Sequence, residues 1–386
     1  MASSTNGYMI TAGGTYSGTF SSDDPNVPAV SILTTAPVIL ENATLSSRGD
    51  LIHILSAGIH VGSNVTIRNV TGTALDPGVA GLHRGAFVRD EEVNTLSVTN
   101  CTMTGVSFGI YVAPIASAGQ ITLDNNMAFN MEDRPSDGNG NLVASREMKG
   151  HFIQLNEVPL TKGADIGWNQ VIDTPGEASV EDIIDIAQSQ GTAANPINIH
   201  DNYLEGAFST GTSGYDYTGG GIMNEGIDPS FALTNAFVTI TNNVVVHTAN
   251  YGIGLAYGHD ITETNNRVVS CGVDSNGVWY EGLSGIAFGI ANFTSPYFYN
   301  NHISGATGGL VRPATVGGAP LGADYWAPSL STANNNTMTG SAFDDPCWTS
   351  PTTVSNQAEI VERTKWNAKV LQAQQVLGDT HTQQVQ

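Results

Sequence analysis

The chain has 386 residues, of which 40% are hydrophobic and only 12% are charged. Its 13 Lys and Arg stand against 35 Asp and Glu, so the formal net charge is −22. Such a surface repels nucleic acid and anionic membranes, and we therefore exclude both as partners. The even spread of hydrophobic residues excludes a disordered chain, and the 44 glycines are typical of many short strands and turns.

The amino-terminal sequence "MASSTNGYMI" has no basic segment and no apolar core, so it shows no signal peptide. No apolar run approaches the ~20 residues needed to cross a bilayer. The three cysteines, Cys101, Cys271 and Cys347, lack the spacing of a metal site. Their odd number and wide separation favour buried thiols, and a disulfide within one pair is the alternative.

Residues 1–45 are polar and strand-like, and we expect them to begin the first coil of a repetitive structure. From residue 51 onwards short β-rich runs recur, and their starts lie between 23 and 43 residues apart. Alternating runs that end in Asn, such as "INIHDNYLEG" and "VTITNNVVV", lie between them. The β-rich runs are "LIHIL", "GAFVRD", "FGIYVAP", "HFIQLNE", "EDIIDIAQ", "GGIMNEG", "YGIGLAYG", "SGIAFGI" and "GGLVRPA".

This repeat predicts a parallel β-solenoid, because each coil can bury its inward side chains only against the coils on either side of it. Asn suits the corners because it tolerates the left-handed backbone conformation. Roughly nine coils at a strand spacing of ~4.8 Å give a rod about 40 Å long. Strand alternation predicts these inward residues: Ile153, Leu155, Ile184, Ile186, Ile253, Leu255, Ile286 and Phe288.

The coils between about residues 45 and 340 resemble the right-handed parallel β-helix of the pectate-lyase-like superfamily. The predicted fold class is then all-β, in a domain of residues 1–350, with residues 351–386 forming a helix and tail packed on the solenoid. The resemblance implies a polysaccharide as the partner and a secreted or periplasmic location. This architecture hosts lyases, hydrolases and non-catalytic fibres, and it leaves the oligomeric state open.

The segment "SNQAEIVERTKWNAKVLQAQQVLG", residues 355–378, predicts a helix that Ser355 or Asn356 caps and Gly378 ends. We expect this helix to cover an end or a face of the solenoid through one apolar side. That side is predicted to hold Ile360, Trp366, Val370 and Leu371.

In "EDIIDIAQ", strand alternation turns Ile184 and Ile186 inward. Glu181, Ile183 and Asp185 then face outward. The two carboxylates lie roughly 7 Å apart on this reading, and Ca²⁺ is a natural partner for such a pair. Pectate lyases bind Ca²⁺ through a Glu and an Asp with this spacing, so the resemblance implies Glu181 and Asp185 as metal ligands. The alternative is a polar outer face whose carboxylates bond to neighbouring coils.

Pectate and alginate lyases place Lys and Arg on the one or two coils after the metal site. Here those coils read "GGGIMNEG" and "YGIGLAYGHD", without either residue. The nearest bases lie on the preceding coil, where Arg146, Lys149 and His151 are the candidates for proton removal and enolate stabilisation. Their alternative role is to neutralise nearby carboxylates. Gln154 and Asn156, on the same coil, are substrate-binding candidates.

Glu225, on the coil after Asp185, is a further catalytic candidate, and the carboxylates of this region also fit a hydrolase. Tyr215 and Tyr217, in "TSGYDYTGGG", offer stacking surfaces to sugar rings, with loop packing as the alternative. His259 is a last substrate-binding candidate, which competes with a structural role at a corner.

We therefore predict a polysaccharide-active protein, and more specifically a lyase that uses Ca²⁺ and acts by β-elimination on a uronate-containing glycan. Two alternatives remain open from the sequence. One is a glycoside hydrolase that acts on a neutral glycan, and the other is a non-catalytic solenoid that binds glycan or protein.

Overall fold

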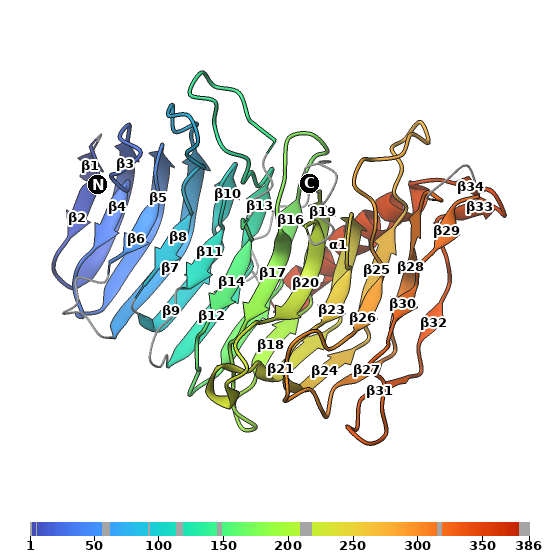
Figure 1. Ribbon diagram of the computed structural model, residues 1–386. Coiled ribbons are helices and arrows are strands. Elements are labelled where there is room, and N and C mark those ends of the chain that lie inside the picture. The colour runs from blue at the N-terminus through green and yellow to red at the C-terminus, as the bar shows by residue number, and fades with distance from the viewer. Residues whose placement is uncertain are drawn as a thin grey trace.

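The computed structural model describes residues 2–4, 6–55, 62–91, 93–112, 119–144, 149–208, 218–314 and 319–377. These residues form a stack of coils whose strands pair in parallel with those of the next coil (Figure 1). The fold is a right-handed parallel β-helix, and both the predicted fold class and the assignment of residues 1–45 to the first coils are confirmed. Within the described residues no helix is both long and apolar enough to span a membrane.

One wall of the solenoid is an 11-stranded sheet with one strand from each coil. Its outer face carries the candidate site described below. The strands, in order along the sheet, are β2 (Tyr8–Ile10), β4 (Val30–Ile32), β6 (Ile52–Ile54), β8 (Val88–Asp90), β11 (Ile110–Val112), β14 (Ile153–Asn156), β17 (Asp182–Ala187), β20 (Gly220–Glu225), β23 (Ile253–Leu255), β26 (Phe288–Ile290) and β30 (Tyr325–Trp326).

The remaining walls form a 21-stranded sheet, in which most coils contribute two strands that meet at a corner. These strands are β1 (Ala2–Ser4), β3 (Gly14–Ser22), β5 (Val38–Ser47), β7 (Ser63–Ala74), β9 (Val93–Thr99), β10 (Thr102–Thr104), β12 (Gln120–Asp124), β13 (Met127–Phe129), β15 (Ala164–Gly167), β16 (Gln170–Ile172), β18 (Ile197–His200), β19 (Tyr203–Ala207), β21 (Ala236–Thr241), β22 (Val244–Thr248), β24 (His259–Thr264), β25 (Arg267–Ser270), β27 (His302–Ser304), β28 (Thr307–Arg312), β29 (Leu321–Gly322), β31 (Thr337–Thr339) and β32 (Ala342–Phe343). A short 3₁₀ helix, η1 (Phe231–Leu233), precedes β21, and a hairpin of β33 (Trp348–Ser350) and β34 (Thr353–Val354) follows the last coil.

The core lies inside the coils, and seven of the eight predicted inward residues belong to it. The exception is Ile286, which is only half-buried. The prediction that Ile183 faces outward is also wrong, because its side chain is fully buried in the core. Both errors have one cause. Near the start of these strands two consecutive residues point inward, as Ile183 and Ile184 do, and as Ala287 and Phe288 do beside Ile286.

Buried asparagines form a ladder along one corner of the 21-stranded sheet. In the coils of the ladder the residue before the ladder asparagine has a positive φ, for example Asn125 at 57° and Asp201 at 52°. The Nδ2 of Asn202 donates to the carbonyl of Ile166 on the preceding coil at 2.9 Å, and its Oδ1 accepts the backbone N–H of Asn169 at 2.9 Å. The same pattern joins Asn126, Asn169, Asn202, Asn243 and Asn266.

The cysteines do not all remain thiols as the sequence favoured. Cys271 and Cys347 form a disulfide across 76 residues, and this wide separation concealed their proximity in space. Cys101 is the buried free thiol, and burial raises its pKa to about 12. It takes the ladder position on its coil, where its backbone N–H donates to Oδ1 of Asn126 at 3.1 Å.

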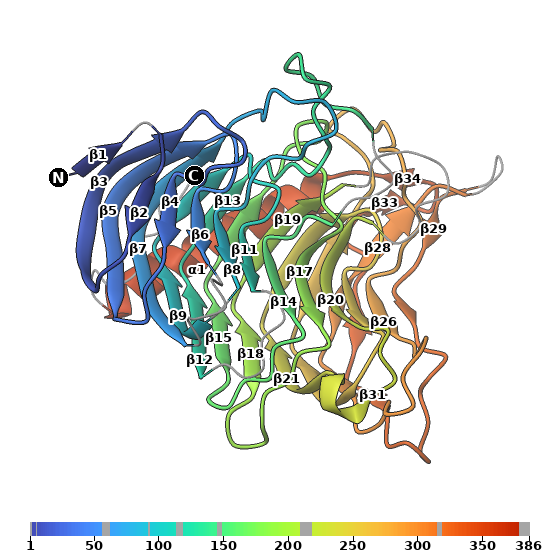
Figure 2. The ribbon, with the colours of Figure 1, turned by 60° about the vertical axis from the view of Figure 1, so that its left-hand side comes forward.

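The helix α1 (Gln357–Leu377) lies along the 21-stranded sheet and covers a face rather than an end of the solenoid (Figures 1 and 2). Trp366 and Val370 are buried as predicted, and Trp366 stacks on Tyr203 with ring centroids 5.8 Å apart. Ile360 and Leu371 are instead about half-exposed, at 50% and 46%.

Two buried glutamates of α1 take the place of those apolar side chains. Glu359 accepts the backbone N–H of Cys271 at 2.6 Å, and Glu362 pairs with Nε of Arg267 at 2.8 Å. Polar contacts with distant residues therefore complete the face through which α1 packs on the sheet. The pattern of apolar residues in the sequence does not reveal such contacts.

We predict that Asn202→Ala lowers the free energy of unfolding by about 2 kcal/mol or more, because it leaves a buried carbonyl and a buried N–H of neighbouring coils unpaired. Urea denaturation measures this change. The control is Asn334→Ala at an exposed position, which should change stability by less than about 0.5 kcal/mol. Equal effects of the two substitutions would contradict the structural role of the ladder.

Glu263 is an unexpected inward residue of β24, stacked between Ile240 and Ile303. Its side chain is 1% exposed, and neither carboxyl oxygen has a hydrogen-bond partner. Burial raises its pKa from 4.5 to about 8, so the folded protein keeps it neutral at physiological pH while the unfolded chain ionises it.

A group with a raised carboxyl pKa in the folded state binds more protons there than in the unfolded state, so stability falls as pH rises from 4.5 to about 8. We predict that Glu263→Met removes this loss and stabilises the protein by a few kcal/mol at the upper end of the interval. Denaturation at both ends of the interval measures the effect, with the exposed Glu281→Met as control. A variant whose stability falls as steeply as that of the wild type would refute the assignment.

Candidate functional site

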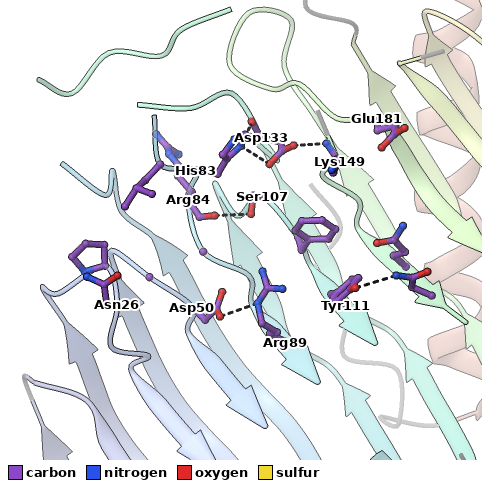
Figure 3. Close-up of a pocket in the computed structure, with 17 residues that line it drawn as sticks. Asn26, Asp50, His83, Arg84, Arg89, Ser107, Tyr111, Asp133, Lys149 and Glu181 are labelled. Atoms are coloured by element: carbon purple, nitrogen blue, oxygen red, sulfur yellow. Dashed lines mark hydrogen bonds and ion pairs between the residues drawn. The ribbon is translucent and has the colours of Figure 1, made fainter. Parts of the chain in front are cut away.

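A cavity of 820 Å³ opens on the outer face of the 11-stranded sheet (Figure 3). It extends across β8, β11 and β14 and is bordered by the loops that precede these strands. Its lining is unusually rich in cationic and aromatic side chains for so acidic a protein. The lining residues are Pro25, Asn26, Gly49, Asp50, Leu82, His83, Arg84, Gly85, Arg89, Ser107, Phe108, Tyr111, Asp133, Lys149, Gln154, Asn156 and Glu181.

The floor of the cavity is one outward column of the sheet. Arg89 is in register with Tyr111, Tyr111 with Gln154, and Gln154 with Asp185. The neighbours of these residues along each strand point into the core, so the period of two turns the column outward. Side chains from sequence-distant strands are thereby brought to adjacent levels about 4.8 Å apart.

Arg89 is fixed by contacts on both sides. Its Nε donates to Oδ2 of Asp50 at 3.0 Å, and its guanidinium lies 5.3 Å from the ring centroid of Tyr111 and 5.9 Å from that of Phe108. The hydroxyl of Tyr111 accepts a hydrogen bond from Nδ2 of Asn156 at 3.1 Å. The arrangement presents one cation and one aromatic phenol to the cavity from a rigid part of the sheet.

The loops add three more basic groups. Oδ1 of Asp133 lies 2.9 Å from Nδ1 of His83, and its Oδ2 accepts the backbone N–H of Lys149 at 2.6 Å. The contacts with Asp133 raise the pKa of His83, and the hydrogen bond to the Asp133 side chain contributes most. Lys149 is exposed and makes no side-chain ion pair within the described residues. Arg84 is held by the carbonyl of Gly105 at 3.3 Å.

The charge of the cavity differs from that of the whole chain. Its lining has three basic side chains, Arg84, Arg89 and Lys149, and three acidic ones, Asp50, Asp133 and Glu181. With all six ionised the lining is formally neutral before His83 is counted. The whole chain carries −22. An anionic ligand is therefore repelled least here, and protonation of His83 would make the cavity positive.

Buried carboxyl groups border the cavity on the side of β17 and β20. Burial raises the pKa of Glu181 to about 8, and repulsion from Glu225 and Asp133 adds to this effect. The pKa values of Asp182, Asp185 and Glu225 are also raised, primarily by burial. This acid cluster, Glu181, Asp182, Asp185 and Glu225, therefore ionises less readily than free carboxyl groups do.

Asp185 points to the outer side of the sheet, where Oδ2 accepts a hydrogen bond from Nε2 of Gln154 at 2.7 Å. It is nevertheless fully buried, because neighbouring side chains cover it. Of the two amides predicted to bind substrate, Gln154 is the one in register with Asp185, and Asn156 is in register with Ala187. Glu225 is not the counterpart of Gln154 on the other side: Met223 is in register with Asp185, and Glu225 is in register with Ala187.

His151 lies beneath the cavity rather than in its lining. It is 1% exposed, Nδ1 bonds to the carbonyl of Asp182 at 3.0 Å, and Nε2 lies 3.6 Å from Oε2 of Glu181. Burial lowers its pKa to about 3, so the ring is neutral, and the carbonyl contact requires that Nδ1 carries the proton. This placement suits a residue that positions the acid cluster.

The structure thus brings together Lys149, Gln154, Asn156 and Glu181 around one cavity, with Asp185 bonded to the floor. His259 lies elsewhere. It is 3% exposed on β24, and its ring stacks with those of Phe231 and Tyr299, so the substrate-binding role predicted for it lacks support and the environment is structural. Arg146, Tyr215 and Tyr217 lie outside the described residues.

Sequence reasoning missed Arg89, Tyr111, Phe108 and the His83–Arg84 pair. Arg89 and Tyr111 stand at the outward positions of "GAFVRD" and "FGIYVAP", two runs already recognised as strands of the repeat. Aligning these runs with "HFIQLNE" in the observed register would have placed them in the column of Gln154. Tyr111 and Arg89 lie one and two coils before Gln154, so closeness in the sequence to Glu181 and Asp185 does not indicate them.

The acid cluster fits a calcium ion in part. Oδ1 of Asp185 is buried and accepts no hydrogen bond, which leaves an oxygen that a cation or a proton would satisfy. Within the described residues, however, no three His, Cys, Asp or Glu side chains are spaced to hold one metal ion. Calcium binding by Glu181 and Asp185 remains a prediction.

No protein-family model matches the sequence, and no curated protein matches it. Among the solved structures to which this chain is similar are two lyases. One is pectate lyase Pel9A, with 12% identity, a TM-score of 0.31 and coverage of 79% of this chain and 69% of that one. The other is an alginate lyase of the PL6 group in complex with a trisaccharide, with 12% identity, a TM-score of 0.26 and coverage of 82% of this chain. This chain spans 56% of the alginate lyase. At this identity the likeness concerns the fold alone.

Proposed function

We propose that this protein is a polysaccharide lyase that cleaves a uronate-containing glycan in the cavity over β8, β11 and β14. The observation that carries the proposal is the gathering of Arg84, Arg89 and Lys149 beside Tyr111 in one cavity of a chain with net charge −22. A structural role for these cations would not require them to border the same open space.

The reaction requires a base and positive charge at one place. The base takes the proton next to the uronate carboxylate, the electron pair forms a carbon–carbon double bond, and the glycosidic oxygen departs and takes up a proton. Arg89 and Arg84 would bind the carboxylate and stabilise the charge that develops on it. Lys149, which is exposed at the rim, is the proposed base, and the Tyr111 hydroxyl is placed to return a proton to the leaving oxygen.

The proposed roles revise those first assigned from the sequence. His151 no longer serves as a base, because it is buried and does not line the cavity. It would instead orient Glu181, whose carboxyl is the nearest member of the acid cluster to the cavity. The disulfide between Cys271 and Cys347 supports a secreted or periplasmic location, since such bonds persist in oxidising compartments.

A glycoside hydrolase is the second candidate, and one observation favours it. Glu181 lines the cavity with a pKa of about 8, as suits a general acid, and other carboxyl groups lie nearby. The products separate the two reactions. A lyase yields unsaturated ends that absorb in the ultraviolet, whereas a hydrolase yields reducing ends alone, and binding without either product indicates a non-catalytic protein.

We predict that Lys149→Ala lowers kcat/KM on an acidic glycan at least about 100-fold, because a positioned base contributes that much to proton transfer. The measurement is the ultraviolet absorbance of unsaturated ends over a panel of uronate polymers. Lys162→Ala removes an exposed lysine that does not line the cavity and should leave the rate unchanged. Comparable loss in both variants, or none in Lys149→Ala, would exclude Lys149 as the base.

Calcium binding can be tested without measuring enzymatic activity. We expect calorimetric titration of chelator-treated protein to show Ca²⁺ binding that Asp185→Ala abolishes, together with a rise in melting temperature that follows mass action. Asp23→Ala, at an exposed position outside the acid cluster, should bind as the wild type does. If the wild type binds no Ca²⁺ at millimolar concentration, protons alone neutralise the cluster.

A further inference from the structure

We propose that a second subsite, on the far side of the acid cluster, binds a neutral sugar unit that carries a methyl group, so that the substrate combines such units with uronates. This inference rests on the proposed function and names its substrate class. The methyl group could belong to a 6-deoxy sugar or to an esterified sugar unit, and the experiment below distinguishes these sources.

The subsite is a cavity of 390 Å³ over the next coils of the same sheet. Glu181 lines the first cavity and its neighbour Asp182 lines the second, so the two openings lie on either side of the acid cluster. A chain of sugar units that follows the sheet would therefore reach both. The lining residues are Asp182, Met223, Glu225, Gly226, Ile227, Tyr251, Ala256, Phe293 and Thr294.

The floor of the second cavity is apolar because glycine replaces the side chains of the outward column. After Met223 the column continues with Gly254 and Gly289. A Cβ at Gly254 would lie 2.5 Å from Sδ of Met223, and one at Gly289 would lie 3.0 Å from the ring of Tyr251. The two glycines thus let Met223 and Tyr251 lie flat over the sheet, where they form a floor suited to a methyl group.

An aromatic platform stands at the rim of this cavity. Phe293 is 57% exposed and Trp326 is 43% exposed, and their ring centroids are 5.8 Å apart. Ile227, at 86% exposure, belongs to the same rim. Exposed rings of this kind offer faces to the apolar side of a sugar.

The two cavities differ in their cationic side chains. The first presents Arg84, Arg89 and Lys149, whereas the described residues that line the second include no Arg, Lys or His, and their ionisable groups are the carboxyl groups of Asp182 and Glu225 and the phenol of Tyr251. A uronate carboxylate in the second cavity would lack a cation and face two carboxyl groups. A neutral unit has no such cost.

The test compares three sets of oligosaccharides of equal length: an unmodified homo-uronate, a uronate alternating with a 6-deoxyhexose, and a methyl-esterified uronate. Binding is followed by calorimetry and cleavage by ultraviolet absorbance. We expect one methyl-bearing set to be bound and cleaved about tenfold better than the homo-uronate, which is the lower end of what a hydrophobic pocket gains from one such group. The set that shows the gain identifies the source of the methyl group.

Phe293→Ala should remove this gain and leave the homo-uronate unaffected. The matched control is Phe231→Ala, an equally exposed phenylalanine that lines neither cavity. Cleavage of the homo-uronate with no gain from a methyl group, or equal effects of both substitutions, would overturn the subsite and leave the lyase proposal intact. Methyl-dependent binding that Phe293→Ala abolishes, without cleavage of any set, would support the subsite and overturn the lyase proposal.

Discussion

Register between successive coils is the constraint on which the rest of this protein depends. Each coil is too short to bury its own side chains, so it gains a core only when it stacks on the next coil residue over residue. The buried asparagines from Asn126 to Asn266 enforce that match. The Nδ2 of each donates to a carbonyl of the coil before it, and the Oδ1 of each accepts the backbone N–H of the ladder residue on that coil. A slip of one residue would leave every one of these amides unpaired inside the protein.

The same register builds the candidate site. Arg89, Tyr111, Gln154 and Asp185 come from four coils, yet they stand in one outward column because their inward neighbours are aligned in the core. The column changes character along its length, from cation and aromatic to buried acid and then to glycine. A ligand that extends along the sheet therefore meets different chemistry at successive levels. This gradient is the physical basis for both the proposed lyase site and the proposed methyl-binding subsite.

Buried acid groups are the second feature that shapes the protein. Asp185 in the outer layer and Glu263 in the core both lie where ionisation is costly, and burial raises the pKa of each. Elsewhere buried carboxylates are paired, as where Glu359 and Glu362 bind the helix α1 to the 21-stranded sheet. The protein thus separates acids that hold the fold together through partners from acids whose pKa is raised by burial. Of the latter, Glu181, Asp182 and Glu225 line the cavities, whereas Glu263 lies in the core.

The sequence by itself determined the solenoid, the inward side chains of most strands and the asparagine corners, because these follow from a local periodicity that repeats many times. It also determined where the helix lies along the chain. It also indicated the segment around Glu181 and Asp185, and the bases and amides of the coil before it. Only the tertiary structure decided what surrounds that segment. The register between coils placed Arg89 and Tyr111 beside Gln154, corners buried Ile183 against the period of two, and docking of α1 exposed Ile360 and buried Glu359. These contacts join residues far apart in the chain, and no local pattern records how many residues each loop inserts between one coil and the next.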